Sequence, residues 1–162
     1  MMVSALWYRA FGTPEAVLRM ERHALSPLLP GKLRVRMLAA PINPSDLIPM
    51  TGAYRHRVVP PLVAGYEGVG RVIAAPDFPD WVGRRVLPLR ASGTWQTVLD
   101  CTPDWLVPVP DEIDDVTAAR AYINPLAALL MLQRFPVAGR RIVLSAARSG
   151  CARLLAATAA QR

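Results

Sequence analysis

The side chains best suited to chemistry lie in one stretch of the chain, residues 41–72. Tyr54 places a phenol at the tip of a loop, and Glu67 places a carboxylate among closely spaced glycines. Such glycines mark bends, or places where another backbone or a ligand comes near. From position alone, the stretch is a loop followed by a glycine-rich strand, and Tyr54 is expected to pack on Pro60 or Pro61.

The same stretch begins with a turn signal, Asn43 to Asp46. A run of Asn, Pro, Ser and Asp is typical of a turn. Ser45 and Asp46 can cap a short helix, and Pro49 is expected to end that helix soon afterwards.

The sequence argues against a metal site. A catalytic zinc needs about three Cys, His or acidic ligands and a structural zinc usually about four. The histidines and cysteines, His23, His56, Cys101 and Cys151, have no ligand spacing. Two cysteines also make no disulfide framework.

A second candidate region lies near the end of the chain. An apolar strand is predicted over Arg141 to Ala146, a tight turn over Ser145 to Gly150, and a helix over Ala152 to Gln161. Strand, turn and helix in this order begin a dinucleotide-binding unit. Before them, Asn124 is predicted to cap a helix with Pro125 in its first turn.

The elements around these regions predict a mainly β fold with some α-helix. Many short strands separated by turn signals indicate a small β-barrel over residues 1–110. Residues 111–162 are predicted to be a helical connection followed by the first strand-turn-helix of an incomplete Rossmann domain. The predicted strands are Met2 to Arg9, Val17 to His23, Leu33 to Ala40, Arg85 to Leu89, Thr94 to Leu99 and Trp105 to Val109, and the connecting helices are Val116 to Ala121 and Leu126 to Arg134.

Composition limits the classes of partner. The net charge is +7, and Lys32 is the only lysine among 19 basic residues. The basic residues are scattered, so no nucleic-acid arm is indicated, and a diffuse positive surface suits phosphate-bearing ligands as well as it suits a solvated face. Arginines interrupt the apolar stretches and the start of the chain has no signal pattern, so we expect neither membrane association nor export and predict a cytoplasmic protein.

The order of the motifs resembles the N-terminal, GroES-like domain of the medium-chain dehydrogenase/reductase superfamily. Within it, the chain is most similar to the 2-enoyl thioester reductases, close relatives of the zinc-independent quinone reductases. Each motif alone is weak, but their shared order and spacing are fairly specific. The motifs are Asn43 to Asp46, Gly52 to Tyr54, Gly65 to Gly70, Gly93 to Trp95, Val107 to Pro110 and Asn124 to Leu126.

The resemblance implies a reaction and a proton donor. Hydride from NADPH adds to the β-carbon of an α,β-unsaturated thioester, and the enolate that forms needs a hydrogen-bond donor and a proton. Tyr54 matches the tyrosine that serves there. Tyr66 stands where related zinc enzymes carry a histidine before Glu67, which implies a zinc-independent enzyme and a structural Glu67. Trp95 is expected to be a core aromatic.

The resemblance also implies a cofactor site for NADP. Asn124 matches a cofactor-contacting asparagine, and Arg148, Ser149, Gly150 and Cys151 match the phosphate turn of the family. Two neighbours depart from the family pattern and weaken this assignment: Ser145 replaces an asparagine and Ala152 replaces a glycine.

Three functions remain open at this point. The chain resembles an NADPH-dependent enoyl thioester reductase that is inactive or incomplete alone, since the rest of a nucleotide domain is missing from it. It also resembles a quinone or enone reductase, which needs no tyrosine donor. The third hypothesis is a non-enzymatic GroES-like module that binds or dimerises. We expect weak NADPH binding, and homodimers through a sheet edge exposed at residues 141–146.

Overall fold

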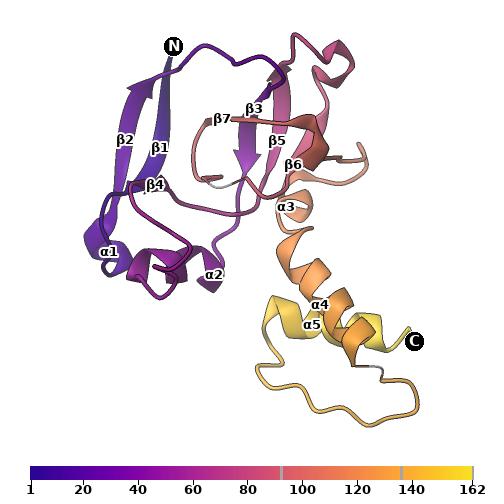
Figure 1. Cartoon of the computed structure of the whole chain (residues 1–162). Coiled ribbons are helices and arrows are strands. Elements are labelled where there is room, and N and C mark those ends of the chain that lie inside the picture. The colour runs from indigo at the N-terminus through magenta and orange to yellow at the C-terminus, as the bar shows by residue number, and fades with distance from the viewer. Residues whose placement is uncertain (92, 136, 162) are drawn as a thin grey trace. The chain divides into compact units, whose positions relative to one another are not determined.

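The computed structural model describes residues 1–91, 93–135 and 137–161. The chain forms two compact units, Met1–Ala119 and Arg120–Arg162. Over these described residues, the first unit holds two antiparallel sheets and the second holds two helices (Figure 1).

The smaller sheet of the first unit has the order β2-β1-β4. Its strands are β1 (Met2–Tyr8), β2 (Leu18–Ala24) and β4 (Leu62–Val63), with α1 (Pro14–Val17) between β1 and β2. Both neighbours of β1 run antiparallel to it, and Tyr8 lies opposite Leu18 and Leu62. In β1, Val3 and Ala5 are buried on one face of the strand, and Tyr8 is buried on the opposite face.

The larger sheet has the order β7-β3-β5-β6-β8, with every pair antiparallel. An isolated antiparallel bridge links Ala5 of β1 to Gln96, two residues before β7. Leu33 and Val35 are fully buried on β3, as the alternation in the sequence predicts. The strands are β3 (Leu33–Ala39), β5 (Val69–Ala74), β6 (Arg85–Pro88), β7 (Val98–Cys101) and β8 (Leu106–Pro108).

Three apolar clusters fill the first unit. The largest packs β3, β5, β6 and β7 together, and it consists of Leu33, Val35, Val72, Ala75, Val86, Leu99 and Leu106. A second cluster joins Val69 and Leu87 to Ala118 and Ala119. The third is built on Tyr8, Met50 and Ala64 and lies under the glycine-rich stretch. These clusters confirm the predicted mainly β fold.

Short helices connect the strands of the first unit. They are α2 (Pro44–Leu47), the 3₁₀ helices η1 (Ile48–Thr51), η2 (Pro79–Trp81) and η3 (Pro103–Trp105), and α3 (Asp115–Ala118). The N-cap residue of α2 is Asn43, and Asp46 completes a capping box by accepting from the Asn43 amide. The chain passes directly from α2 into η1 at Ile48, so Pro49 lies inside η1.

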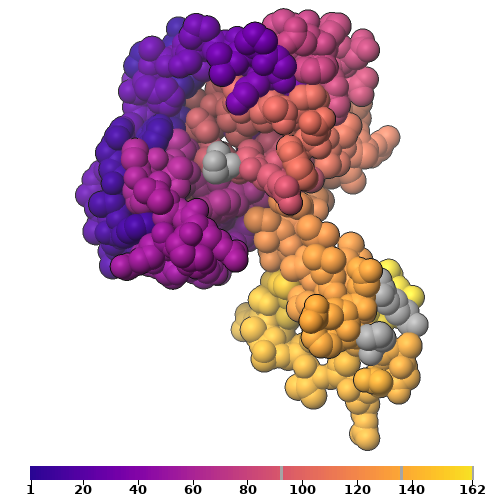
Figure 2. Space-filling view, viewed as in Figure 1, coloured from indigo at the N-terminus to yellow at the C-terminus, as the bar shows by residue number. Residues whose placement is uncertain are grey.

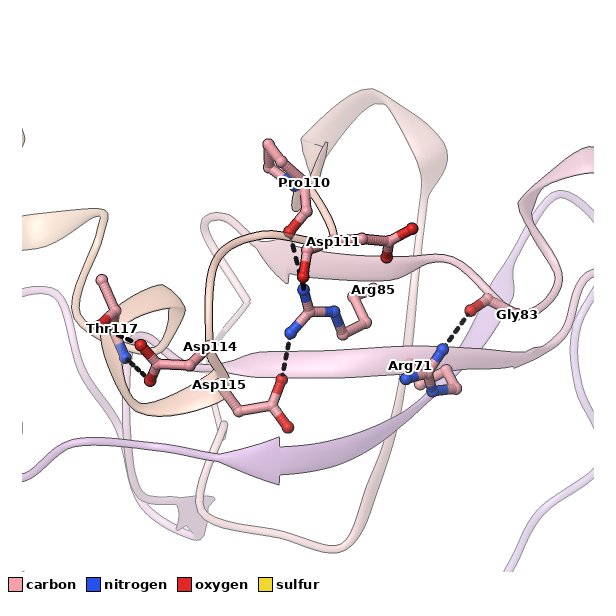
Figure 3. Close-up of polar contacts among 8 residues, drawn as sticks. All are labelled: Arg71, Gly83, Arg85, Pro110, Asp111, Asp114, Asp115 and Thr117. Atoms are coloured by element: carbon pink, nitrogen blue, oxygen red, sulfur yellow. Dashed lines mark hydrogen bonds and ion pairs between the residues drawn. The ribbon is translucent and has the colours of Figure 1, made fainter.

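A half-buried arginine fastens α3 to the larger sheet. Arg85 on β6 donates from Nη1 to Asp115 Oδ1 at 2.7 Å, and from Nη2 to the carbonyls of Pro110 (2.7 Å) and Asp111 (3.2 Å) (Figure 3). Asp114 caps α3 by accepting from the Thr117 amide at 2.9 Å. One guanidinium therefore fixes the whole approach to α3.

The second unit consists of α4 (Ile123–Arg134) and α5 (Gly150–Ala159), which pack on each other. The cap of α4 is Tyr122, so the prediction that Asn124 caps this helix is wrong. Asn124 instead lies in the first helical turn together with Pro125, which has no N–H to satisfy there.

The predicted strand over residues 141–146 is also wrong. These residues form no strand, and Val143 is 98% exposed. An apolar run becomes a strand only when a neighbouring strand takes its backbone hydrogen bonds, and no described segment pairs with this run. The sheet edge that was expected to drive dimerisation therefore does not form, although the helix expected after it does.

Candidate functional site

Asp46 holds two loops of the candidate site together. Its side chain is 1% exposed, and it accepts from the backbone amides of Asn43 (2.7 Å) and Tyr66 (3.0 Å). The first bond closes the start of α2, and the second ties α2 to the glycine-rich stretch. Burial raises the pKa of Asp46 even though both amides favour its charged form.

Glu67 is the second buried carboxylate of this region. It is 2% exposed, and its Oε1 accepts from the side-chain amide of Asn43 at 2.7 Å. Asn43 thus connects both carboxylates, one through its backbone and one through its side chain. This arrangement agrees with the prediction of a structural role for Glu67.

Gly65 joins this pair of loops to a third, Gly93 to Trp95. The Gly65 carbonyl accepts from the Gly93 amide (2.9 Å) and from the Thr94 amide (3.2 Å). Gly65 has φ +92°, and a Cβ atom there would lie 2.8 Å from Trp95 Cγ and closer still to the Thr94 hydroxyl. Only glycine allows both this backbone conformation and this close approach.

Trp95 is half-buried and packs at the edge of the core. Its ring lies against the cluster built on Tyr8, Met50 and Ala64. Its indole Nε1 donates to the Pro41 carbonyl at 3.1 Å, which fixes the chain just before Asn43. The motifs that lie far apart in the sequence are therefore one connected hydrogen-bonded structure.

Two buried hydroxyls lie beneath these loops. Tyr8 Oη and Thr94 Oγ1 form no hydrogen bond of good geometry among the described residues, and the Tyr8 phenol lies beside that of Tyr66. Burial, with the neighbouring Tyr66 phenol, raises the pKa of Tyr8 to about 12. Burial and the Asp46 charge also raise the pKa of Tyr66. Both phenols therefore stay neutral over the physiological range.

Tyr54 lies on a turn between η1 and β4 and is 43% exposed. Its carbonyl accepts from the Arg57 and Val58 amides at 2.8 and 2.9 Å, which fixes the turn. Its ring meets His56 edge-on at 6.3 Å between centroids. Among the described residues nothing bonds its hydroxyl, so the hydroxyl can donate to a bound molecule.

An open apolar groove of about 400 Å³ adjoins the Gly93 to Trp95 loop. Leu6, Met37, Ile42 and Trp95 line it, and the groove also contains Thr94. Methionine and leucine side chains adapt to apolar groups of varied shape. The groove can therefore take an apolar part of a small molecule.

No group of three or more His, Cys, Asp or Glu side chains converges as a metal site would in the part of the chain that the structure describes. Tyr66 occupies the position before Glu67, and its phenol lies beside that of Tyr8. No described helix is long and apolar enough to cross a membrane.

The predicted cofactor residues lie in the second unit. Ser149 caps α5, its Oγ accepting from the Ala152 amide at 3.2 Å. Gly150 and Cys151 are the first two residues of α5, and Arg148 precedes the cap. The amides of a first helical turn and an adjacent arginine suit a phosphate, so the donor set fits the predicted group. Asn124 lies in the first turn of α4.

The chain matches the alcohol dehydrogenase GroES-like domain over residues 29–111. That range contains all three hydrogen-bonded loops described above. The chain belongs to this family. The role of Tyr54 and the binding roles of Asn124 and Arg148 to Cys151 stay predictions.

The GroES-like chain is similar to named reductases. It is 35% identical to human mitochondrial enoyl-[acyl-carrier-protein] reductase over 153 residues, which covers 91% of this chain and 41% of that protein. The Xenopus tropicalis mitochondrial enoyl-[acyl-carrier-protein] reductase is 36% identical, and the match covers 90% of this chain and 43% of that protein. The chain thus spans about two fifths of the length of these curated relatives.

Solved structures share the fold of the GroES-like chain. A Bacillus thuringiensis protein assigned as an NADPH:quinone reductase superposes with a TM-score of 0.91 and 43% identity, covering 99% of this chain and 50% of that one. A complex of Etr1p with NADP and crotonyl-CoA superposes with a TM-score of 0.77, and the match covers 96% of this chain and 50% of the Etr1p chain. At 22% identity, that likeness concerns the fold alone.

Sequence reasoning missed two features of the GroES-like site. It assigned Asp46 only a capping role, although the carboxylate is buried and also binds the Tyr66 amide of the glycine-rich stretch. It also missed the pairing of Tyr8 with Tyr66. Tyr8 lies on the face of β1 opposite Val3 and Ala5, so no local pattern reports its burial or the residue that it meets there.

Proposed function

We propose that this chain is the GroES-like part of a zinc-independent, NADPH-dependent reductase that acts on α,β-unsaturated thioesters. The observation that carries the proposal is the exposed Tyr54 hydroxyl on a fixed turn, next in the chain to the hydrogen-bonded loops. The named relatives at 35–36% identity, which are enoyl-[acyl-carrier-protein] reductases, support the substrate class.

In this proposal Tyr54 supplies a proton or a hydrogen bond to the reacting enolate. A neutral phenol is a suitable donor when negative charge develops on a thioester oxygen. The apolar groove beside Trp95 would take an apolar part of the substrate. Asp46 and Glu67 would act only as positioning residues, since both are buried and bonded to the loops.

The cofactor would be held by the second unit. Arg148, Ser149, Gly150 and Cys151 would bind a phosphate of NADP through helix N-terminal amides and the arginine charge, and Asn124 would contact the cofactor from α4. When bound, the reduced dinucleotide supplies the hydride for this class of reaction. The relatives assigned or named as NADPH-dependent support this choice of cofactor.

A quinone or enone reductase is the second candidate. The relative that favours it is the Bacillus thuringiensis structure assigned as an NADPH:quinone reductase, at 43% identity. Reduction of a quinone gives a stable product without a tyrosine donor. The role of Tyr54 therefore distinguishes the two candidates.

The test is Tyr54→Phe in a full-length context, with this chain joined to the nucleotide domain of a relative. The change removes one hydroxyl and leaves the ring, so folding should not change. Loss of a general acid costs about a hundredfold or more in rate, roughly 3 kcal/mol of barrier. The loss should fall on kcat with crotonyl-coenzyme A, because the bond strengthens only as charge develops.

Quinone reduction by the same protein serves as the internal control and should change little. Tyr8→Phe is a matched control, since it removes a buried hydroxyl that forms no hydrogen bond of good geometry among the described residues. Thioester turnover within about threefold of the parent after Tyr54→Phe would remove the proton-donor role. The quinone reductase candidate would then be preferred.

A further inference from the structure

A second cavity of about 470 Å³ opens on the first unit. Its walls come from the end of β2 with the loop after it, from β7, and from the segment that follows β6. Figure 2 shows the surface hollowed there, beneath the chain that leads from β2 to β3. The volume lies within the range of about 300–1,000 Å³ that is usual for small-molecule sites.

The cavity carries positive charge that the fold does not neutralise. Lys32 and Arg90 both line it, and neither forms an ion pair within the described ranges. Asp100 is the one carboxylate among the lining residues, and it is already engaged by Arg34, whose Nε and Nη2 donate to its two oxygens at 2.8 Å each. The free charge in the cavity is therefore cationic, which attracts anions.

Arg90 is held in an unusual conformation. Its φ is +55°, which is uncommon for a residue other than glycine. Its guanidinium carbon lies 4.1 Å from the centroid of the Trp105 ring, another lining residue. A guanidinium stacked on an indole keeps its N–H edge for an acceptor in its own plane, such as a carboxylate or phosphate.

The remaining wall is partly apolar. Leu25, Leu89 and Leu99 contribute aliphatic surface, and Cys101 behaves as a neutral thiol because burial raises its pKa to about 11. A flat apolar group can therefore contact these side chains while an attached anionic group reaches the cations.

We propose that this cavity binds an organic anion in which a phosphate or carboxylate is attached to a flat apolar group. Lys32 and Arg90 bind the anionic oxygens, and the leucine wall contacts the flat group. The cavity lies wholly within the first unit. The proposal does not depend on the proposed reductase function.

The test uses the complete chain with phenyl phosphate and benzoate as probes. Because Lys32 is the only lysine, labelling lysine with ¹³C gives a single side-chain signal by nuclear magnetic resonance. We expect that signal to shift saturably with both probes, and calorimetry to give the same dissociation constants. Binding should weaken with added salt, since the cations contact solvent.

Three substitutions identify the contacts. Lys32→Met and Arg90→Gln should each weaken phenyl phosphate binding by about tenfold, the usual effect of one lost charged hydrogen bond. Arg84→Gln is the matched control, because Arg84 also stacks on a tryptophan, Trp81 at 5.7 Å, but does not line the cavity. It should change binding by less than about twofold.

Several outcomes would overturn the proposal. No saturable shift of the Lys32 signal, or equal losses in the Arg84→Gln and Arg90→Gln variants, would exclude an anion site here. Benzyl alcohol binding as tightly as benzoate would show that the cations are not used. Inorganic phosphate binding as tightly as phenyl phosphate would contradict recognition of the flat group.

Discussion

Gly65→Ala tests the close packing between the glycine-rich stretch and the Gly93 to Trp95 loop. The new methyl group meets two penalties. A non-glycine residue at φ +92° costs roughly 1–2 kcal/mol of strain. The Cβ atom must also displace Trp95 and Thr94, and overpacking of this kind typically costs about 1–3 kcal/mol. The expected loss in the free energy of unfolding is about 2–5 kcal/mol.

Gly83→Ala separates the two penalties. Gly83 has φ +87°, nearly the same as Gly65, but a Cβ atom there meets nothing within 4 Å. This variant should lose only the strain, about 1–2 kcal/mol. The difference between the two variants, about 1–3 kcal/mol, is then the packing penalty at Gly65.

Urea unfolding, followed by tryptophan fluorescence, measures the difference in the free energy of unfolding between Gly65→Ala and Gly83→Ala. All four tryptophans, at positions 7, 81, 95 and 105, lie in Met1–Ala119, so the signal reports on the first unit alone. In thermal unfolding the two variants should differ by roughly 4–12 °C in Tm, at about 4 °C per kcal/mol for a unit of this size. Equal losses in Gly65→Ala and Gly83→Ala would refute the packing of the two loops described here.

Three further predictions concern Asp46, Arg85 and Cys101 in the first unit. Asp46→Asn leaves one backbone amide facing an NH₂ group, so we expect the free energy of unfolding, measured with urea, to fall by about 1–3 kcal/mol. Because burial raises the folded-state pKa of Asp46 above its ordinary value of 3.8, its stabilising contribution is complete below that pH and is lost as the pH rises through the folded pKa. The difference in the free energy of unfolding between the parent and Asp46→Asn should therefore become smaller from about pH 3.5 to pH 7. A difference that grows with pH would contradict the raised pKa of Asp46. Arg85→Lys should lower the free energy of unfolding by about 1–3 kcal/mol, because an ammonium group cannot reach all three acceptors of the guanidinium. The control Arg84→Lys should lower it by less than about 0.5 kcal/mol. Similar losses in the two variants would show that the hydrogen bonds of Arg85 contribute little. At about pH 8, iodoacetamide should alkylate Cys101 roughly a hundredfold more slowly in the folded chain than in urea, because its raised pKa leaves less thiolate. Mass spectrometry of the Cys151→Ser variant measures this rate at Cys101 alone. Comparable rates in the two conditions would be incompatible with the raised pKa.

Much of the barrel could be predicted because its strands carry their own signal. The strand β3 alternates Leu33 and Val35 with arginines, and both apolar side chains are fully buried. The helix α5 likewise follows from good helix formers behind Ser149, which caps it as a serine commonly does.

Most of what the sequence did not predict depends on a partner distant in the sequence, and the exception is the cap of α4, which is a local error. Residues 141–146 have the composition of a buried strand, but pairing decides whether a strand forms. Asn124 has the properties of a cap, but the helix begins one residue before it. The burial of Asp46 depends on the Tyr66 amide, twenty positions away, and nothing in the local sequence reports that contact.

The order of the strands in the larger sheet has a consequence for how the protein is made. The strand β3 pairs on one side with β5 and on the other with β7, whose residues Val98–Cys101 are translated much later. At about 5–20 residues per second, a ribosome needs roughly 3–12 s to make the chain between β3 and β7. During that interval one edge of a strongly apolar strand stays unpaired on the nascent chain. We expect the barrel to close late, after β7 leaves the ribosome, and chaperones that bind extended apolar segments to contact β3 before then.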